Sequence, residues 1–372
     1  MMKNLFPRIW PRILVLAAIV TCISDGQVWA GGEAADGNYD FPFPLPNSSI
    51  PVPSFAVEPN EPGLMPKLTE GSFQGNIIKK ITVSGSTIYS AEELEKITAP
   101  YLGKPLGAQA DKQTLDEAAQ AITDRYRKDG YFLSYASVPV QTVADGTYRL
   151  EVTEGYVSEV VLEGEVGPVY ALLQSYLAQI PEKRPLNLRD AERYLQLARD
   201  VPGISLSSVF RRATGVSGGR ELRVKVERRT YGGMVNFDNR GTLIIGPGQA
   251  LGRIYTDSNT FMGEHLELLY SNSFDAQHFK FTGPRNALDA QHYIAVATSA
   301  QIGNDGLQIQ LGGAYAQARP GGPLNPDGTP DLNYLTTVGY KIRNQSINTG
   351  LFYPIIRGSS LNLGALMQFT LS

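Results

Sequence analysis

Residues 147–153 read Thr-Tyr-Arg-Leu-Glu-Val-Thr, and residues 221–227 read Glu-Leu-Arg-Val-Lys-Val-Glu. In both stretches apolar side chains alternate with charged or polar ones, which is the pattern of a β-strand buried on one face. Each stretch also closes a segment that begins with a similar strand and continues with helical patterns. The two stretches therefore predict two tandem copies of one small α/β unit.

We expect the first copy at residues 77–155, in the order β-α-α-β-β. Ile81 and Val83 alternate with polar residues, which predicts the opening strand. Ser90 with Glu93 three residues later forms a capping box, which marks the start of a short helix.

A second helix and two strands complete this unit. We predict the strands over residues 134–143 and 147–153, and Gly130 marks the end of the helix. One face of that helix is apolar at Leu115, Ala118, Ala119, Ile122 and Tyr126.

The second copy is expected at residues 156–229, with the same β-α-α-β-β order. Val160 and Leu162 repeat the opening strand, and Pro202-Gly203 ends the second helix. The apolar face of this helix consists of Leu188, Ala191, Tyr194, Leu195 and Ala198.

Residues 1–30 have the pattern of an export signal. Lys3, Arg8 and Arg12 precede the apolar run 13–20, and small residues suited to cleavage follow. That run is too short for a membrane-spanning helix, which needs about 20 residues. The single cysteine, Cys22, lies inside this segment, so the exported chain would have no disulfide or thiolate site.

The composition excludes several classes of protein. A net charge of −3 argues against nucleic-acid binding, which needs a basic excess. After residue 30 no apolar run is long enough for a membrane helix, so membrane insertion would require a closed β-barrel. The intervening residues 31–75 are rich in proline and glycine, which favours an extended spacer over a ligand for a proline-binding module.

Residues 231–372 show repeated strand-length segments separated by turn-rich breaks. Apolar and polar residues alternate over about ten positions per segment, as in the strands of a transmembrane barrel. A soluble β-sandwich is the alternative that gives the same alternation. In the last segment the residues predicted to face lipid are Leu361, Leu363, Met367 and Phe369. The predicted fold class is thus α+β tandem repeats followed by an incomplete antiparallel transmembrane β-barrel.

The chain resembles the two-partner secretion transporters of the hemolysin secretion/activation family. Both α/β units resemble the family's polypeptide-transport-associated (POTRA) domains, and the following strands resemble its barrel. The motifs that carry the resemblance are Asp129-Gly130-Tyr131, Leu150 to Gly155, Leu186-Asn187-Leu188, Asp238-Asn239-Arg240-Gly241, and Phe352 to Arg357. Because fewer strands are present than in the family's barrel, we expect a C-terminally incomplete member.

The resemblance implies an outer-membrane translocator with its POTRA domains in the periplasm. Its partners would be outer-membrane lipid and a large secreted β-helical exoprotein with an N-terminal secretion domain, but no nucleic acid. The middle strand of each unit would bind this partner as an added strand. The residues implied for binding are Tyr135, Ser137, Pro139, Gln141, Leu206, Val209, Phe210, Arg211 and Arg212. Ordinary solvated charge is an equally open interpretation of the two arginines.

We expect no enzyme, no cofactor and no metal site. His265, His278 and His292 lack the spacing of metal ligands, and the Gly246 to Gly252 stretch lacks the Lys-Ser/Thr end of a phosphate loop. Two alternatives to secretion stay open. One is a POTRA-barrel factor that assembles other outer-membrane proteins, and the other is a soluble periplasmic binding module with a β-sandwich tail.

Overall fold

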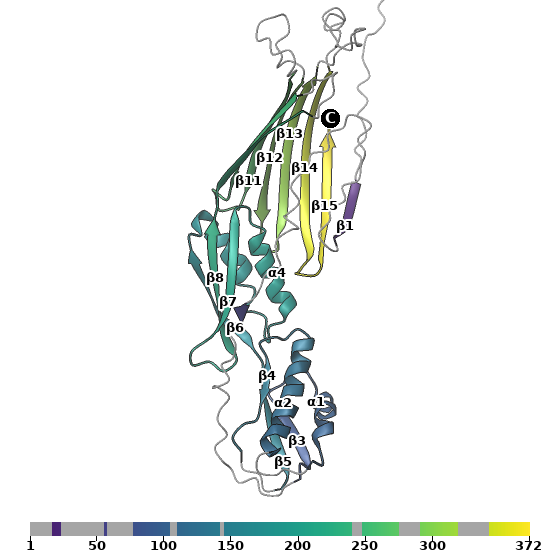
Figure 1. Cartoon of the computed structure of the whole chain (residues 1–372), viewed down its shortest axis with the longest axis vertical. Helices are drawn as coiled ribbons and strands as arrows, with labels where there is room; N and C mark the ends of the chain where they lie inside the picture. The colour runs from purple at the N-terminus through teal and green to yellow at the C-terminus, as the bar shows by residue number, and fades with distance from the viewer. Residues whose placement is uncertain are drawn as a thin grey trace, which may run out of the picture.

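The structure is a computed structural model. It describes residues 17–23, 56–57, 77–104, 110–141, 145–239, 248–274, 291–318 and 342–372. The remaining parts of the predicted spacer, of the 134–143 strand and of the Asp238 to Gly241 motif lie outside the described residues, as does His278. Figure 1 shows two small α/β domains below and a large curved sheet above.

The first domain has the predicted order β-α-α-β-β. Its sheet order is β3-β5-β4, with β5 parallel to β3 and antiparallel to β4. Ser90 caps α1 as expected, because its side chain accepts from Glu93 N while Glu93 Oε2 accepts from Ser90 N at 2.9 Å. The elements are β3 (Lys80–Ser84), α1 (Ala91–Thr98), the 3-10 helix η1 (Ala99–Tyr101), α2 (Ala110–Lys128), β4 (Tyr135–Ser137) and β5 (Thr147–Thr153).

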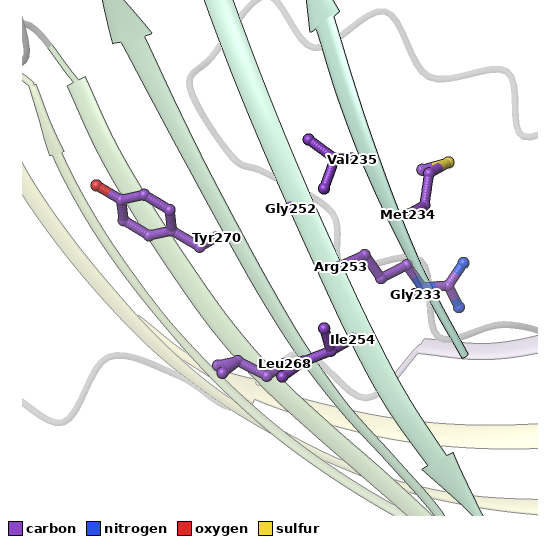
Figure 2. Close-up of a pocket in the computed structure, with 8 residues that line it drawn as sticks. All are labelled: Gly233, Met234, Val235, Gly252, Arg253, Ile254, Leu268 and Tyr270. Atoms are coloured by element: carbon purple, nitrogen blue, oxygen red, sulfur yellow. The ribbon is translucent and has the colours of Figure 1, made fainter. Parts of the chain in front are cut away.

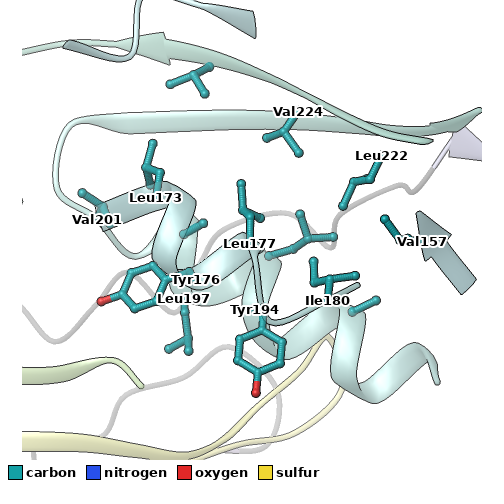
Figure 3. Close-up of a cluster of buried hydrophobic side chains, with 14 of the residues drawn as sticks. Val157, Leu173, Tyr176, Leu177, Ile180, Tyr194, Leu197, Val201, Leu222 and Val224 are labelled. Atoms are coloured by element: carbon teal, nitrogen blue, oxygen red, sulfur yellow. The ribbon is translucent and has the colours of Figure 1, made fainter. Parts of the chain in front are cut away.

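The second domain repeats this order. Its sheet order is β2-β7-β8-β6, and the short β2 comes from the proline-rich segment. Figure 3 shows the core between α3, α4 and the sheet, where Leu173 and Leu177 lie near Val224. The elements are β2 (Ala56–Val57), β6 (Tyr156–Gly164), the 3-10 helix η2 (Gly167–Val169), α3 (Tyr170–Leu177), α4 (Leu188–Arg199), β7 (Ile204–Arg212) and β8 (Gly219–Arg228).

The two domains meet in a shared joint. Leu133 is only 4% exposed and belongs to the core of the second domain, although the sequence alone assigned it to the first unit. Phe132 packs edge-on against Phe210 with ring centroids 5.4 Å apart. The backbone N–H of Leu188 donates to Gly130 O at 2.8 Å. The joint therefore fixes the start of α4 against the end of the first domain's helices.

Position 130, in this joint, requires a residue without a side chain. Its φ is +92°, and an added Cβ would lie 3.0 Å from the side chain of Asn187. Asn187 caps α4 by accepting from Arg189 N at 3.0 Å, and its Nδ2 donates to Asp129 O at 3.0 Å. The helix cap of the second domain is thus also a bond to the first.

The large sheet is antiparallel, with the order β1-β15-β14-β13-β12-β11-β10-β9. From β9 to β15, strands that follow one another in sequence are neighbours, and within the described residues no pairing joins β9 to β1. The prediction of an incomplete barrel-type sheet is confirmed. The strands are β1 (Ala17–Ile23), β9 (Tyr231–Asp238), β10 (Gly248–Asp257), β11 (His265–Phe274), β12 (Gln291–Ile302), β13 (Leu307–Ala318), β14 (Ile342–Arg357) and β15 (Asn362–Leu371).

One edge of this sheet is paired by part of the predicted export signal. Ala17 lies opposite Gln368 and Ile23 opposite Asn362, so β1 runs antiparallel along β15. An edge strand exposes unpaired backbone groups, and β1 supplies partners for them here. The assignment of residues 1–30 to a signal peptide stays a prediction. None of the helices in the described ranges is both long and apolar enough to cross a membrane.

The shared joint makes a testable prediction. Leu133→Ala should destabilise the second domain by about 2–5 kcal/mol, because it leaves a cavity in that core. Hydrogen exchange measured by mass spectrometry on the full chain should show faster exchange in β8. Leu102→Ala is the control, since Leu102 is 41% exposed. Faster exchange confined to the first domain would contradict the joint.

Candidate functional site

The predicted middle strand of the first domain is much shorter than expected. The prediction of a strand over 134–143 is wrong, because β4 covers only Tyr135–Ser137. Pro139 has no N–H to donate, and the main chain leaves β5 at this point. The side chain of Gln141 pairs with Arg149 instead, donating to its O at 2.9 Å and accepting from its N at 2.8 Å. Pro139 and Gln141 therefore lie outside β4, the strand that was predicted to bind a partner.

The helix α2 covers part of β4. The backbone N–H of Ala136 donates to Thr123 Oγ1 at 3.0 Å, and Thr123 Oγ1 donates to Ala119 O at 2.9 Å. Tyr135 and Ser137 are half-buried on the same short strand. An edge this short, with a backbone donor already bonded to a helix, offers little to an added strand.

The middle strand of the second domain is longer and contains every residue of that unit that was implied for partner binding. It covers Ile204–Arg212, where Arg211 and Arg212 are exposed and Leu206 and Val209 are half-buried. Phe210 is fully buried in the core, so only its backbone could contact a partner. The described structure thus leaves β7 as the better candidate of the two predicted edges.

Two residues of the chain itself already pair with β7. Ala56 lies opposite Val209 and Val57 opposite Phe210, in parallel orientation. The β7 edge is therefore already paired within the chain at Val209 and Phe210. Pairing between segments so distant in sequence leaves no local pattern, which is why periodicity could not reveal it.

The backbone direction of β7 follows from one side-chain contact. Arg199 Nη2 donates to Leu206 O at 3.2 Å, so this carbonyl points away from β8. In an antiparallel strand the N–H and C=O of one residue point to the same side, and this side alternates from each residue to the next. Ser208 is two residues after Leu206, so its N–H also points away from β8. Ser208 therefore lies on the pairing edge, one residue before the part covered by β2.

The large sheet has one apolar face. Met367 lies opposite Leu351, and Leu351 lies opposite Ile309, so the register carries the same face from strand to strand. Leu363 and Phe369 share this face, whereas Leu361 precedes β15. Many residues on it are exposed although they are large and apolar, and such a surface indicates contact with lipid or protein. Examples across the sheet are Val235, Ile254, Leu268, Val296, Leu311, Ile347, Met367 and Leu371.

Figure 2 shows a hollow in this sheet near the β9 edge. Its volume is 390 Å³, and Gly233 and Gly252 leave the space between larger side chains. Ile254, Leu268 and Tyr270 line it with little polar surface. The hollow is thus part of the apolar face. The full lining is Gly233, Met234, Val235, Gly252, Arg253, Ile254, Leu268 and Tyr270.

The opposite face of the sheet is polar and carries mostly uncharged amides near its centre. Gln310 and Asn348 are 2% and 3% exposed, and each has a buried side-chain oxygen that finds no hydrogen-bond donor among the described residues. Gly350 lies opposite Gln310 and Gly312 lies opposite Asn348 in the pairing of β13 with β14. This polar face has the chemistry of a barrel lumen.

The histidines of the large sheet make local polar contacts. His265 contacts Asp257 at 2.5 Å and Glu267 at 3.2 Å. His292 lies 2.9 Å from Tyr270 Oη. Among the described residues, no group of three or more His, Cys, Asp and Glu is arranged to hold a metal ion.

Comparison with known proteins agrees with this architecture. Residues 77–155 match the family "POTRA domain, ShlB-type". The chain is 26% identical over 212 residues to the outer membrane transporter CdiB of Escherichia coli, a match that covers 54% of this chain and 34% of that protein. It is 24% identical over 183 residues to the heme/hemopexin transporter protein HuxB of Haemophilus influenzae, which covers 48% and 31%.

A solved structure of CdiB from Escherichia coli shares the fold. It superposes with a TM-score of 0.57 at 18% identity, covering 82% of this chain and 52% of that chain. By sequence, the chain spans about a third of the length of the two curated relatives, CdiB and HuxB. It is a homologue of these outer-membrane transporters, and residues 77–155 form a POTRA domain of the ShlB type.

The two faces of the sheet make the second prediction. Met367→Lys should reduce insertion of the full chain into lipid vesicles, since a charge on the lipid face costs about 2–4 kcal/mol at the midplane. The neighbouring Gln368→Lys is the matched control, because Gln368 lies on the polar face. Insertion can be followed by the protease-resistant fraction. Equal insertion of both variants would show that the faces are assigned wrongly.

Proposed function

We propose that this homologue of CdiB and HuxB acts in two-partner secretion. Its two POTRA-type domains bind an unfolded secreted protein in the periplasm, and the large sheet forms part of the pore through which that protein leaves. The observation that carries the proposal is the sheet with one apolar and one polar face, joined directly to two α/β domains with strand edges.

The second domain provides the main docking edge. β7 is nine residues long and β4 is three, and the N–H of Ala136 on β4 already bonds to Thr123. An added strand gains affinity mainly from main-chain hydrogen bonds, so the longer edge binds more strongly. The partner is a large β-helical exoprotein, whose N-terminal secretion domain would pair with β7 in an extended conformation.

Side chains beside this edge would select the partner. Leu206 and Val209 are half-buried and could contact alternate side chains of an added strand. Arg211 and Arg212 are exposed at the end of β7 and would add attraction to acidic residues. Such exposed charges change the rate of association more than the final affinity.

The large sheet would contribute passage rather than catalysis. Leu363, Met367 and Phe369 would face outer-membrane lipid, and the amides of Gln310 and Asn348 would face the moving chain. Neutral amides can exchange hydrogen bonds with an extended backbone and do not hold it by charge. No cofactor is needed for this role.

A proline substitution tests the docking edge. Ser208→Pro removes one edge N–H but no bond to β8, so it should weaken binding of the partner's secretion domain about tenfold. Ser208→Ala keeps the N–H and should bind within about twofold of the unchanged chain. Binding is measured by titration calorimetry on the full chain in detergent.

Circular dichroism must first show that both Ser208 variants stay folded. Arg211→Ala and Arg212→Ala complete the comparison. If these changes abolish binding while Ser208→Pro binds normally, recognition is electrostatic and the edge is not the docking site.

The β2 segment should compete with the partner for the same edge. We expect that replacing residues 54–59 by a Gly-Ser linker of equal length strengthens partner binding, because Ala56 and Val57 no longer occupy β7. A tethered competitor acts at an effective concentration of about millimolar, so the gain should be severalfold. A Gly-Ser replacement of residues 34–39, ahead of β2, is the control. Equal affinity of both chains would show that β2 does not block the edge.

A further inference from the structure

The helix α4 ends in a buried ion pair with the large sheet. Asp200 is the C-cap residue of α4, and Arg357 is the last residue of β14. Arg357 Nε lies 2.6 Å from Asp200 Oδ2, and Arg357 Nη2 lies 2.5 Å from Asp200 Oδ1. The two side chains are 11% and 8% exposed. This is the two-pronged geometry in which arginine binds a carboxylate most strongly.

Further contacts join the same helix to the same turn. Arg193 Nη1 donates to Pro354 O at 3.2 Å and to Ile355 O at 3.1 Å. The register of β14 shifts between Pro354 and Ile356, and this bulge frees carbonyl groups for Arg193. Glu192 accepts from Ser359 Oγ at 2.7 Å. One side of α4 is thus bonded along the end of β14 and the turn that follows it.

A neighbouring turn of the sheet also contacts α4. Gly306, in the turn between β12 and β13, has φ +83°, and an added Cβ would lie 2.4 Å from Leu197 Cδ2. Figure 1 shows α4 directly beneath these strands. The helix therefore contacts two turns at the same end of the sheet, and its close approach depends on a glycine.

Asp200 is poorly placed for the stability of its own helix. The C-terminal end of a helix carries partial negative charge and favours a cation. Burial raises the pKa of the Asp200 carboxyl, and Arg357 lowers it by hydrogen bonding and by its charge. The hydrogen bonds that this carboxylate accepts from a side chain come from Arg357 of the sheet, so its role concerns the contact between the domain and the sheet.

We propose that Asp200 and Arg357 are positioning residues that hold the second POTRA-type domain, and with it the β7 edge, at a fixed place below strands β12 to β15. β7 follows α4 after only a short turn, so the orientation of α4 sets the orientation of the edge. What this positioning means for transport rests on the proposed function. A partner strand bound to β7 is thereby aligned with one end of the polar face.

Spin labels can measure this positioning without any transport assay. In a Cys22→Ser background, Ser207→Cys on β7 and Asn304→Cys on the β12–β13 turn provide two exposed labelling sites. Double electron–electron resonance on the full chain in detergent should give a narrow distance distribution. Arg357→Gln and Asp200→Asn should each broaden it, with loss of the single peak. Arg343→Gln, at an exposed position on the same strand, is the matched control and should leave the peak unchanged.

Asp200→Asn keeps the experiment decisive if Arg357→Gln fails to fold, because Arg357 still has a hydrogen-bond acceptor in Asn362 Oδ1, at 3.1 Å. A peak that stays narrow in a folded Asp200→Asn chain overturns the positioning role. Partner binding by calorimetry separates this failure from that of the proposed function. The expected result is unchanged affinity in the Asp200 variant, with loss of secretion of the partner by that variant. If the unchanged chain does not bind partner but the variants still broaden the peak, the positioning holds and the secretion function is wrong.

Discussion

Backbone N–H and C=O groups along the edge of a sheet need partners, and this chain supplies them in several different ways. In the first POTRA domain, Thr123 bonds to the backbone of β4, and Gln141 replaces the missing main chain beside β5. In the second domain Ala56 and Val57 pair with part of β7, and in the large sheet β1 pairs with β15. The edges differ in how strongly they are covered, and that difference decides which of them can accept a partner.

The two α/β domains and the sheet are connected by specific contacts rather than by loose linkers. Leu133 enters the core of the second domain, and Asn187 bonds back to the first. At the other end Asp200 pairs with Arg357 of the sheet. A single helix, α4, carries the contacts with both neighbours: its N-terminal end bonds to the first domain, and Glu192, Arg193 and Asp200 bond to the sheet. Movement of the first domain relative to the sheet would therefore require at least one of these contacts to break.

The exposed charged network of the first domain and the buried ion pair between α4 and the large sheet have different roles. In the first domain Arg125, Asp129 and Tyr89 form an exposed network, and hydrogen bonds from Tyr89 and Arg125 lower the pKa of Asp129. Such exposed pairs contribute little to stability because water competes for them. The Asp200–Arg357 pair is buried, so the loss of one partner would leave an uncompensated charge. Interfaces built in this way favour one arrangement strongly over its alternatives.

Local patterns in the sequence were sufficient for the two β-α-α-β-β units, the capping box at Ser90 and the two faces of β15. Each of these depends on residues a few positions apart, whose spacing is set by the geometry of a helix or a strand. The shortening of β4, the pairing of Ala56 with Val209 and the contact of Asp200 with Arg357 were decided only by the tertiary structure. They join residues that are far apart in the chain, and nothing in the local spacing of either partner encodes the other. Edge pairing and domain contacts depend on which surfaces meet after the elements have formed, and therefore appear only in the folded chain.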